Sequence, residues 1–276
     1  MKKQIKIISI FSLILCSNLL SSCGDTSHKI TVCASELPHA QILNESVKPL
    51  LKAKGYDLEV TVLNWTLQND AVKDGDYDAN YFQHVPYLLS YSGNEKQENV
   101  FATAKIHYEP LRIYAGKKAV SYTDHNATFA ICNDVSNATR ALDLLITSNV
   151  ISSYDKTSDD NADLTKLPSR ISLIAENLLV SSLADYDYAV LPCNTAMTGN
   201  IDATSENNKN LPSESETLAN AKANIIAAST TRYKSDEIYK NKIDALTDTL
   251  LSKDVKNYID TTWKGVVLTY QVDLRK

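Results

Sequence analysis

Apolar residues follow two spacings along the chain. Short apolar runs of the kind found in buried strands occur at residues 29–34, 58–63, 77–81, 128–132, 170–174 and 188–191. At residues 40–54 and 136–148, apolar residues instead recur three and four positions apart, which is the spacing of an amphipathic helix. Strands that alternate with helices are typical of βαβ units, so the pattern predicts an α/β protein with mostly parallel sheets.

The same pattern predicts two lobes. A long extended stretch at residues 100–115 is followed by a polar run to residue 126, which we interpret as a crossing into a second lobe. Polar residues dominate 153–166 and 202–222, which are predicted to be surface loops. A strand at 224–228, helices at 235–251 and 255–262 and a strand around 266–270 then return to the first lobe. We therefore expect lobe 1 to contain residues 29–116 plus 224–276 and lobe 2 to contain residues 117–223, with a ligand cleft between them.

Residues 1–22 have the features of a secretory signal. Three lysines precede the apolar run Ile7 to Leu15, which is too short to span a bilayer. The run ends at Leu20-Ser-Ser-Cys23, which resembles the lipobox of bacterial lipoproteins, where the cysteine thiol receives a lipid. We expect residues 23–28 to be a tether lipidated at Cys23 that holds the protein on the extracytoplasmic side of the cell envelope, with inner or outer membrane left open. An ordinary signal peptide followed by a chance cysteine is the alternative.

Composition excludes several functions. The signal carries three lysines and no acid, so its removal changes the net charge from −5 to −8, which argues against a nucleic-acid partner. Only 7 glycines occur, and none forms a dinucleotide-binding or P-loop motif, so no cofactor is expected. The five histidines are scattered, and no C-x-x-C or H-E-x-x-H motif occurs, so we expect no metal site.

Aromatic and amide side chains are concentrated in residues 74–87, around a predicted turn from a strand to a helix. The segment holds Tyr77, Tyr81, Phe82, Gln83, His84 and Tyr87. Aromatic faces supply apolar area, and the amide, imidazole and hydroxyl groups supply directional hydrogen bonds, so the segment fits one wall of a small-molecule pocket. A tyrosine-rich core element is the alternative.

A second wall is predicted where the strand at 128–132 leads into the next helix. Free N–H groups at a helix start attract anions, and Arg140, one turn inside the helix, can hold a carboxylate with two parallel hydrogen bonds. Asn137 lies on the same helix face as Arg140. Asn194 and Asn224 occupy comparable strand-edge positions, although an asparagine taken singly is more often a turn or cap residue there, and Arg140 could instead pair with a surface acid.

The chain resembles the methionine-binding lipoproteins of the NlpA family from about Ile30 to Tyr270. The most specific shared motif is Asp78-Ala-Asn-Tyr-Phe-Gln-His84; weaker ones are Pro38-His39-Ala40, Glu109-Pro110, Asn133-Asp134 with Ser136-Asn137 and Arg140, and Ala223-Asn-Ile-Ile226. The resemblance implies a two-lobed, type II periplasmic-binding-protein-like fold. It also implies that the protein captures L-methionine or a related small amino acid for the permease and ATPase subunits of an ABC importer, and that it performs no chemistry.

The resemblance also assigns roles to residues. It implies that Arg140 and Asn137 hold the ligand carboxylate, and that Asn194 and Asn224 surround its amino group. Four side chains would enclose the thioether, namely Trp65, Phe82, His84 and Tyr87. Sulfur attracts aromatic ring edges modestly, which suits such a wall.

Several departures from the family pattern keep alternatives open. Ala34-Ser-Glu-Leu37 replaces a glycine-rich strand end, and Cys132 and Cys193 replace other residues beside the expected pocket. A Cys132–Cys193 disulfide is possible if their strands are neighbours, although two unpaired cysteines are favoured. For function, the main alternative is a surface lipoprotein of the same fold with an antigenic or adhesive role. A hydrolase is less favoured because no G-x-S-x-G motif accompanies the histidines.

Overall fold

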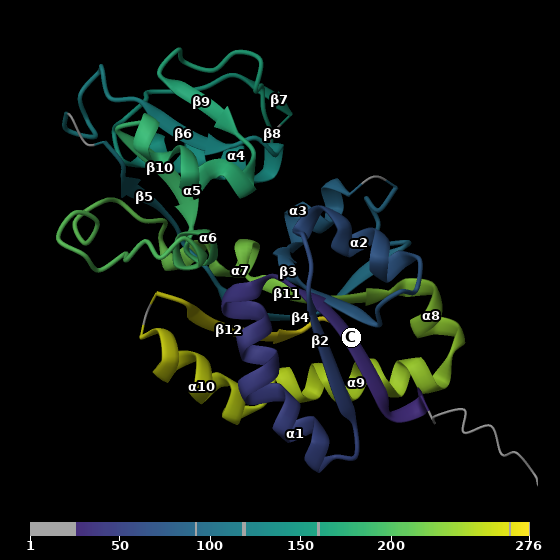
Figure 1. The fold of residues 1–276 in the computed structure, drawn as a ribbon. Helices are drawn as coiled ribbons and strands as arrows, with labels where there is room; N and C mark the ends of the chain where they lie inside the picture. The colour runs from purple at the N-terminus through teal and green to yellow at the C-terminus, as the bar shows by residue number, and fades with distance from the viewer. Residues whose placement is uncertain (1–25, 92, 118–119, 159–160, 265, 276) are drawn as a thin grey trace, which may run out of the picture.

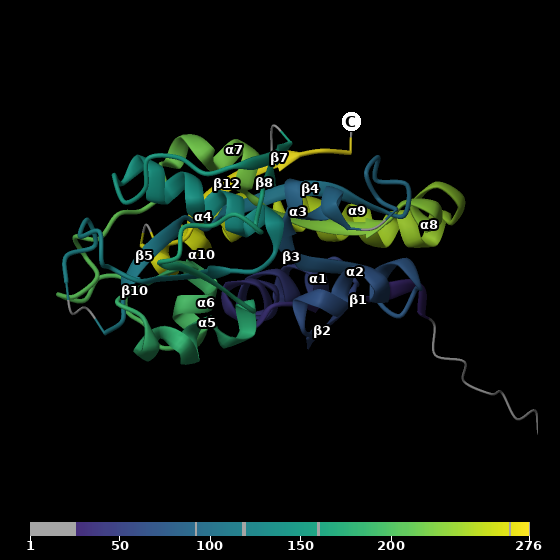
Figure 2. The same ribbon diagram turned by 90° about the horizontal axis from the view of Figure 1, so that it is seen from above.

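The structure is a computed structural model that describes residues 26–91, 93–117, 120–158, 161–264 and 266–275. The predicted signal at residues 1–22 and the predicted lipidation site Cys23 lie outside the described residues. Figure 1 shows two lobes, each built on its own sheet, and Figure 2 shows them from above. This arrangement confirms the prediction of a two-lobed α/β fold with helices flanking each sheet.

The larger sheet belongs to lobe 1 and has the strand order β12-β4-β11-β3-β1-β2. Its strands are β1 (Lys29–Ala34), β2 (Asp57–Val62), β3 (Ala79–His84), β4 (Val100–Tyr108), β11 (Asn224–Ser229) and β12 (Leu268–Asp273). The first four run in one direction, whereas β11 and β12 run in the other. The sheet is therefore mixed, with two parallel and three antiparallel pairings among the described strands.

Successive residues of each strand face opposite sides of this sheet, so its two faces have separate cores. On one face, Val32 and its neighbours pack under α1 (Lys48–Ala53), α9 (Glu237–Leu250) and α10 (Lys253–Trp263). On the other face, Cys33 packs near α2 (Trp65–Lys73) and α3 (Val85–Ser90). Wider helical turns at Ile42–Val47 precede α1, and α8 (Thr230–Ser235) follows β11.

The smaller sheet belongs to lobe 2 and has the order β5-β10-β6-β9. Its strands are β5 (Leu111–Ala115), β6 (Phe129–Cys132), β9 (Ile171–Ile174) and β10 (Tyr188–Pro192), of which β5 alone runs against the others. The helix α4 (Val135–Thr147) covers one face, and α5 (Glu176–Ser182) and α6 (Cys193–Thr198) cover the other. A small hairpin, β7 (Lys156–Ser158) with β8 (Asn161–Ala162), and α7 (Ala219–Lys222) lie in the loops that were predicted from polarity.

The chain crosses between the lobes earlier than the sequence indicated. The strand β5 pairs with β10 in lobe 2, so the crossing is at Glu109-Pro110, whereas the sequence placed residues up to 116 in lobe 1. The apolar pattern is continuous across both strands, and it cannot show that a strand has changed sheets. Pro110 marks the change, because proline has no N–H to continue a ladder of hydrogen bonds.

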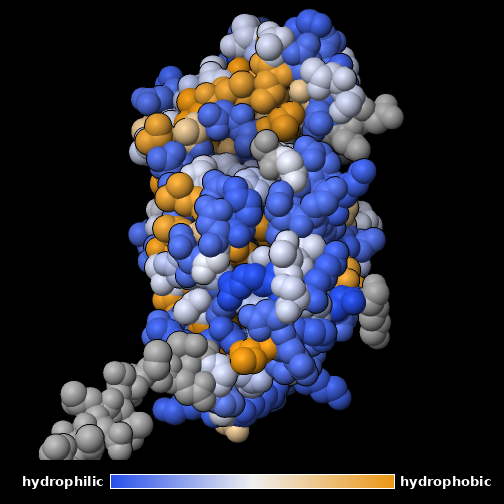
Figure 3. Space-filling view, turned by 90° about the vertical axis from the view of Figure 1, so that its right-hand side faces the viewer, coloured by the Kyte–Doolittle hydropathy of each residue, from blue (hydrophilic) through white to orange (hydrophobic). Residues whose placement is uncertain are grey.

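The surface carries few large apolar side chains. Figure 3 shows a face that is mainly hydrophilic, with an apolar patch towards its upper end. Among the described residues, the exposed large apolar side chains are Val62, Leu67, Leu178, Leu218, Ile238 and Val272. Within the described ranges, no helix is both long and apolar enough to cross a membrane.

Candidate functional site

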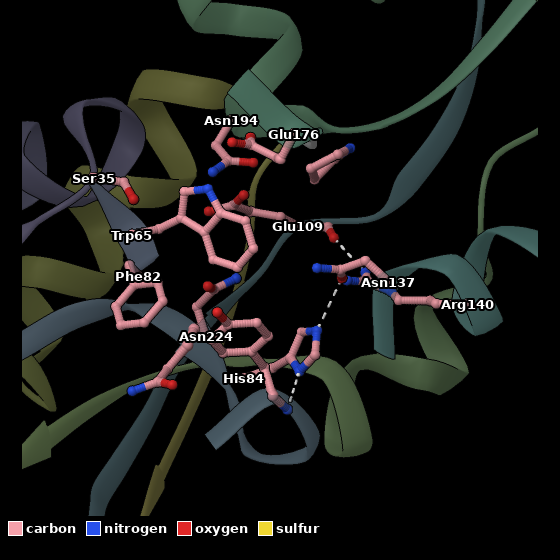
Figure 4. A pocket seen from close by; sticks show the side chains of 13 residues that line it. Ser35, Trp65, Phe82, His84, Glu109, Asn137, Arg140, Glu176, Asn194 and Asn224 are labelled. Atoms are coloured by element: carbon pink, nitrogen blue, oxygen red, sulfur yellow. Dashed lines mark hydrogen bonds between the residues drawn. The ribbon is translucent and has the colours of Figure 1, made fainter. Parts of the chain in front are cut away.

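A cavity of about 80 Å³ lies between the lobes. This is room for several water molecules, because one water needs roughly 10–15 Å³ on the same scale. Every side chain that the sequence assigned to the ligand lines it: Trp65, Phe82, His84, Tyr87, Asn137, Arg140, Asn194 and Asn224. Ser35, Gln83, Glu109, Glu176 and Pro192 complete the lining (Figure 4).

Three aromatic rings form the apolar side of the cavity. Asn64 accepts the Thr66 N–H and caps α2, which fixes Trp65 at the start of that helix. The rings of Trp65 and Tyr87 lie 5.1 Å apart, and Phe82 meets Tyr87 edge to face at 5.8 Å. These separations are typical of favourable aromatic pairs, so the rings form one continuous wall that belongs to lobe 1.

His84 connects this wall to the opposite lobe. It ends β3, and its Nδ1 accepts the Tyr87 N–H at 3.2 Å, which caps α3. Burial first, and then the charge of Arg140, lower the pKa of His84 to about 3, so the ring is neutral at pH 7. Because Nδ1 accepts, the proton is on Nε2, which donates to Asn137 Oδ1 at 3.2 Å across the cleft.

Asn137 is held by the start of α4. Asp134 caps this helix by accepting the Asn137 N–H at 2.9 Å, and it also accepts from Asn137 Nδ2 at 3.0 Å. Both ends of the Asn137 amide are therefore engaged, one by Asp134 and one by His84. Asn137 links the lobes in this structure as well as lining the cavity.

Arg140 is paired with an acid, as the alternative from the sequence allowed, but the pair is buried rather than at the surface. Its Nε donates to Glu214 Oε1 at 2.7 Å, and its Nη2 donates to Glu214 Oε2 at 2.6 Å and to the Glu109 carbonyl at 2.7 Å. Burial alone would lower the pKa of Arg140, but the Glu214 carboxylate outweighs it and the net pKa is raised. The fork expected to grip a ligand carboxylate is thus occupied by Glu214, and Nη1 is the nitrogen that neither acceptor engages.

Glu109 stands where the chain crosses between the lobes, with only 3% of its surface exposed. Its Oε1 lies 2.6 Å from His107 Nε2 and 3.4 Å from His39 Nε2, and the His107 Nδ1 contacts the Tyr81 hydroxyl. Burial raises the pKa of Glu109, an effect opposed by His39, Arg140 and the Asn194 backbone N–H. Burial lowers the pKa of His39 to about 4 and that of His107 to about 3.

The ligating atoms of His39, His107 and Glu109 lie within 4.8 Å of one another, which raises the question of a metal ion. Two ligands of a tetrahedral metal stand about 3.3 Å apart when each is about 2.0–2.1 Å from the ion. The 2.6 Å between His107 Nε2 and Glu109 Oε1 is too short for that, but it suits a shared proton. His107 also uses its second ring nitrogen, so the group fits a hydrogen-bonded network better than a metal centre.

The remaining polar lining residues come from the starts of α5, α6 and β11. Glu176, at the start of α5, accepts from the Thr195 hydroxyl, and it also receives a hydrogen bond from Trp65 of lobe 1. Burial raises its pKa. Asn224 Oδ1 lies 3.2 Å from His39 Nε2, and the Asn194 side chain points towards Glu109 in Figure 4.

Sequence reasoning missed three acids at or behind the cavity. Glu109 was noted only as part of a motif, Glu176 was not singled out, and Glu214 was placed in a polar surface loop although it is 8% exposed. The one available signal was the Glu109-Pro110 pair at a strand end. The cysteines Cys33, Cys132 and Cys193 are unpaired and buried, as favoured. The strands of the latter two are neighbours, but Cys132 donates to Asp134 and Cys193 to the Pro110 carbonyl.

The two lobes and the lined cavity between them define a two-lobed substrate-binding protein. Residues 30–270 match the NlpA lipoprotein family, and the chain belongs to it. It is 30% identical over 271 residues to the methionine-binding lipoprotein MetQ of Bacillus subtilis, covering 93% of this chain and 95% of that protein. The family is one of substrate-binding lipoproteins, and this protein is not an enzyme.

Solved structures agree with this assignment. A lipoprotein from Ruminococcus gnavus is 33% identical, with a TM-score of 0.75 over 88% of this chain and 99% of that one. A nutrient-binding protein from Burkholderia cenocepacia, solved with bound methionine, is 28% identical, with a TM-score of 0.73 over 87% of this chain and 99% of that one.

Proposed function

We propose that this protein is an extracytoplasmic receptor, anchored by lipid on Cys23, that captures L-methionine or a related small amino acid and delivers it to the permease and ATPase of an ABC importer. The observation that carries the proposal is the cavity, which gathers an aromatic wall from lobe 1 and polar groups from both lobes around one space. The names of its relatives support methionine, since the Bacillus subtilis protein is called methionine-binding and the Burkholderia cenocepacia structure holds methionine.

The cavity suits the two ends of a zwitterionic thioether amino acid. Arg140 Nη1 offers a donor to the ligand carboxylate, and the side chains of Asn194 and Asn224 line the part of the cavity expected to hold the amino group. Trp65, Phe82 and Tyr87 offer ring edges and faces to the thioether end. Closure around the ligand excludes water, which strengthens the charged hydrogen bonds.

A thermal-shift screen of the purified protein against the amino acids tests this function. A ligand at 100 times its Kd adds roughly 2.7 kcal/mol to stability, which is an easily measured shift. We expect methionine to give a large shift and aspartate, which carries a second carboxylate, to give none. If no amino acid shifts the transition, the alternative of a surface lipoprotein without transport function is favoured.

Substitution of Arg140 tests the assigned carboxylate contact. We expect Arg140→Ala to weaken methionine binding by roughly 30-fold or more, because a buried charged hydrogen bond is lost. Arg170→Ala is the control, since the Arg170 side chain donates to the Asp124 and Val150 carbonyls within lobe 2 and does not line the cavity. Unchanged affinity of a folded Arg140→Ala variant in calorimetry would place the carboxylate elsewhere.

A further inference from the structure

Glu109 presents a carboxylate to the cavity from a fixed position. It lies between β4 and β5, and its own carbonyl accepts from Arg140 Nη2 at 2.7 Å, so the backbone at the crossing is held in place. Figure 4 shows its side chain extending from the crossing into the space surrounded by Asn194, Asn224 and Trp65. The carboxylate therefore faces whatever occupies the cavity.

The hydrogen bonds behind Glu109 make its Oε1 a hydrogen-bond acceptor. If the Tyr81 hydroxyl donates to His107 Nδ1, then His107 Nε2 carries the ring proton and donates it to Glu109 Oε1. Each donor in this series of three residues then has an acceptor. The reverse arrangement would leave the Tyr81 hydroxyl proton without an acceptor among the described residues. A buried polar proton without an acceptor costs about 1–3 kcal/mol, so the first arrangement is favoured.

No fixed cation of the described residues faces this carboxylate at hydrogen-bonding distance. His39 and His107 are both neutral at pH 7, and Arg140 directs Nε and Nη2 to Glu214 and to the Glu109 backbone carbonyl, not to the Glu109 carboxylate. A buried carboxylate that has only neutral partners is costly unless a cation joins it. The missing charge is one that a ligand can supply.

We propose that Glu109 accepts the ammonium group of the bound amino acid and makes the site selective for ligands with a free α-amino group. The assignment rests on the proposed function, and it deepens it by naming the group that distinguishes an amino acid from a hydroxy acid of the same shape. An ammonium offers three donors and a positive charge, which complement the open side of the carboxylate. His39 and His107 are positioning residues behind it, since both approach Oε1 from the buried side.

The second acid of the cavity provides a matched control. Glu176 carries the same charge and also lines the cavity, but the Thr195 hydroxyl and the Trp65 indole already donate to it. A general electrostatic effect would respond equally to the loss of either carboxylate. A direct contact with the ammonium responds only to the loss of Glu109.

The test compares L-methionine with its 2-hydroxy analogue, which keeps the carboxylate and thioether and replaces the ammonium by a hydroxyl. Calorimetry measures both affinities for the wild-type protein, Glu109→Gln and Glu176→Gln. We expect the wild-type protein to prefer methionine by at least about 30-fold, as for other buried charged contacts. Glu109→Gln should lose that preference while it still binds the analogue, and Glu176→Gln should keep it.

Each other outcome has a defined meaning. An undiminished preference in Glu109→Gln, or an equal loss in Glu176→Gln, overturns the assignment and leaves the proposed function intact. Failure of the wild-type protein to bind either probe overturns the proposed function, and the assignment with it. If Glu109→Gln does not fold, a crystal structure of the wild-type protein with methionine decides: an ammonium nitrogen within about 3.2 Å of a Glu109 carboxylate oxygen supports the assignment, and one bonded only to Asn194 or Asn224 overturns it.

Discussion

Removal of the Glu214 carboxylate is the sharpest available test of how the cavity is held together. Glu214 accepts from Arg140 Nε and Nη2 at 2.7 and 2.6 Å, from the Tyr108 hydroxyl at 3.0 Å and from the Leu111 N–H at 2.7 Å. Arg140 and Glu214 side chains are only 4% and 2% exposed, so water cannot replace the lost acceptor without reorganising the site. Glu214→Ala therefore leaves a buried, unpaired guanidinium.

The expected magnitude follows from this burial. Removing one partner of a buried ion pair costs about 3–5 kcal/mol, and for a chain of this size 1 kcal/mol shifts Tm by about 2–4 °C. We expect Glu214→Ala to lower Tm by roughly 6–20 °C in calorimetric or fluorescence melting of the ligand-free protein. Methionine affinity should fall as well, because Arg140 loses the partner that orients it.

Glu206→Ala is the matched control for this prediction. Glu206 pairs with Lys209 at 2.6 Å in the same loop region, but the two side chains are 87% and 44% exposed. Exposed pairs contribute about 0–1 kcal/mol, so this change should be nearly neutral. If the two variants lose equal stability, within about 0.5 kcal/mol, the pairing of Arg140 with Glu214 is not what holds this wall.

Three further predictions concern acid stability, cysteine pairing and the aromatic wall. Burial lowers the pKa of His39 to about 4 and those of His84 and His107 to about 3. In the unfolded chain these histidines bind protons near pH 6.5, so the free energy of unfolding should be retained above pH 6.5. Below pH 6.5 it should fall by up to about 1.4 kcal/mol per pH unit for each histidine. Urea titrations at pH 7 and pH 5 measure this loss, and equal stabilities would contradict buried neutral rings. Thiol labelling without reductant should modify Cys33, Cys132 and Cys193 only after unfolding, whereas a Cys132–Cys193 disulfide peptide in mass spectrometry would show the pairing to be wrong. Methionine should change the tryptophan fluorescence through Trp65, which lines the cavity. The change should vanish in Trp65→Phe and persist in Trp263→Phe, because Trp263 packs on Tyr258 in lobe 1, away from the cavity lining. The opposite pattern would place the ligand elsewhere.

The regular elements of the fold could be predicted because their signals are local. The strand at 128–132 and the helix at 136–148 are within a residue or two of β6 and α4, since a buried strand and an amphipathic helix repeat with different periods. The switch of β5 to the other sheet could not be predicted, because the apolar pattern of an extended chain is the same in either sheet. It is a matter of pairing partners, which lie far away in the sequence.

The candidate site was predictable in part for the same reason. His84 lies in a segment of locally unusual composition and Arg140 lies one turn inside a predicted helix start, and the structure brings both to the cavity. Glu214 lies in a polar stretch that looks like any surface loop, and its burial depends on long-range contacts with Arg140 and Leu111. The hydrogen bond between His84 and Asn137 joins the lobes and could be seen only once they were folded together.

Calorimetric titration of L-methionine into ligand-free protein tests the central claim most directly. Unfolding and refolding the purified protein first removes any amino acid carried over from the expression host. We predict saturable binding of one methionine per molecule that Arg140→Ala weakens and Arg170→Ala does not. Absence of binding by methionine and by related small amino acids would contradict the account, since the cavity between Trp65 and Arg140 would then serve another ligand or none.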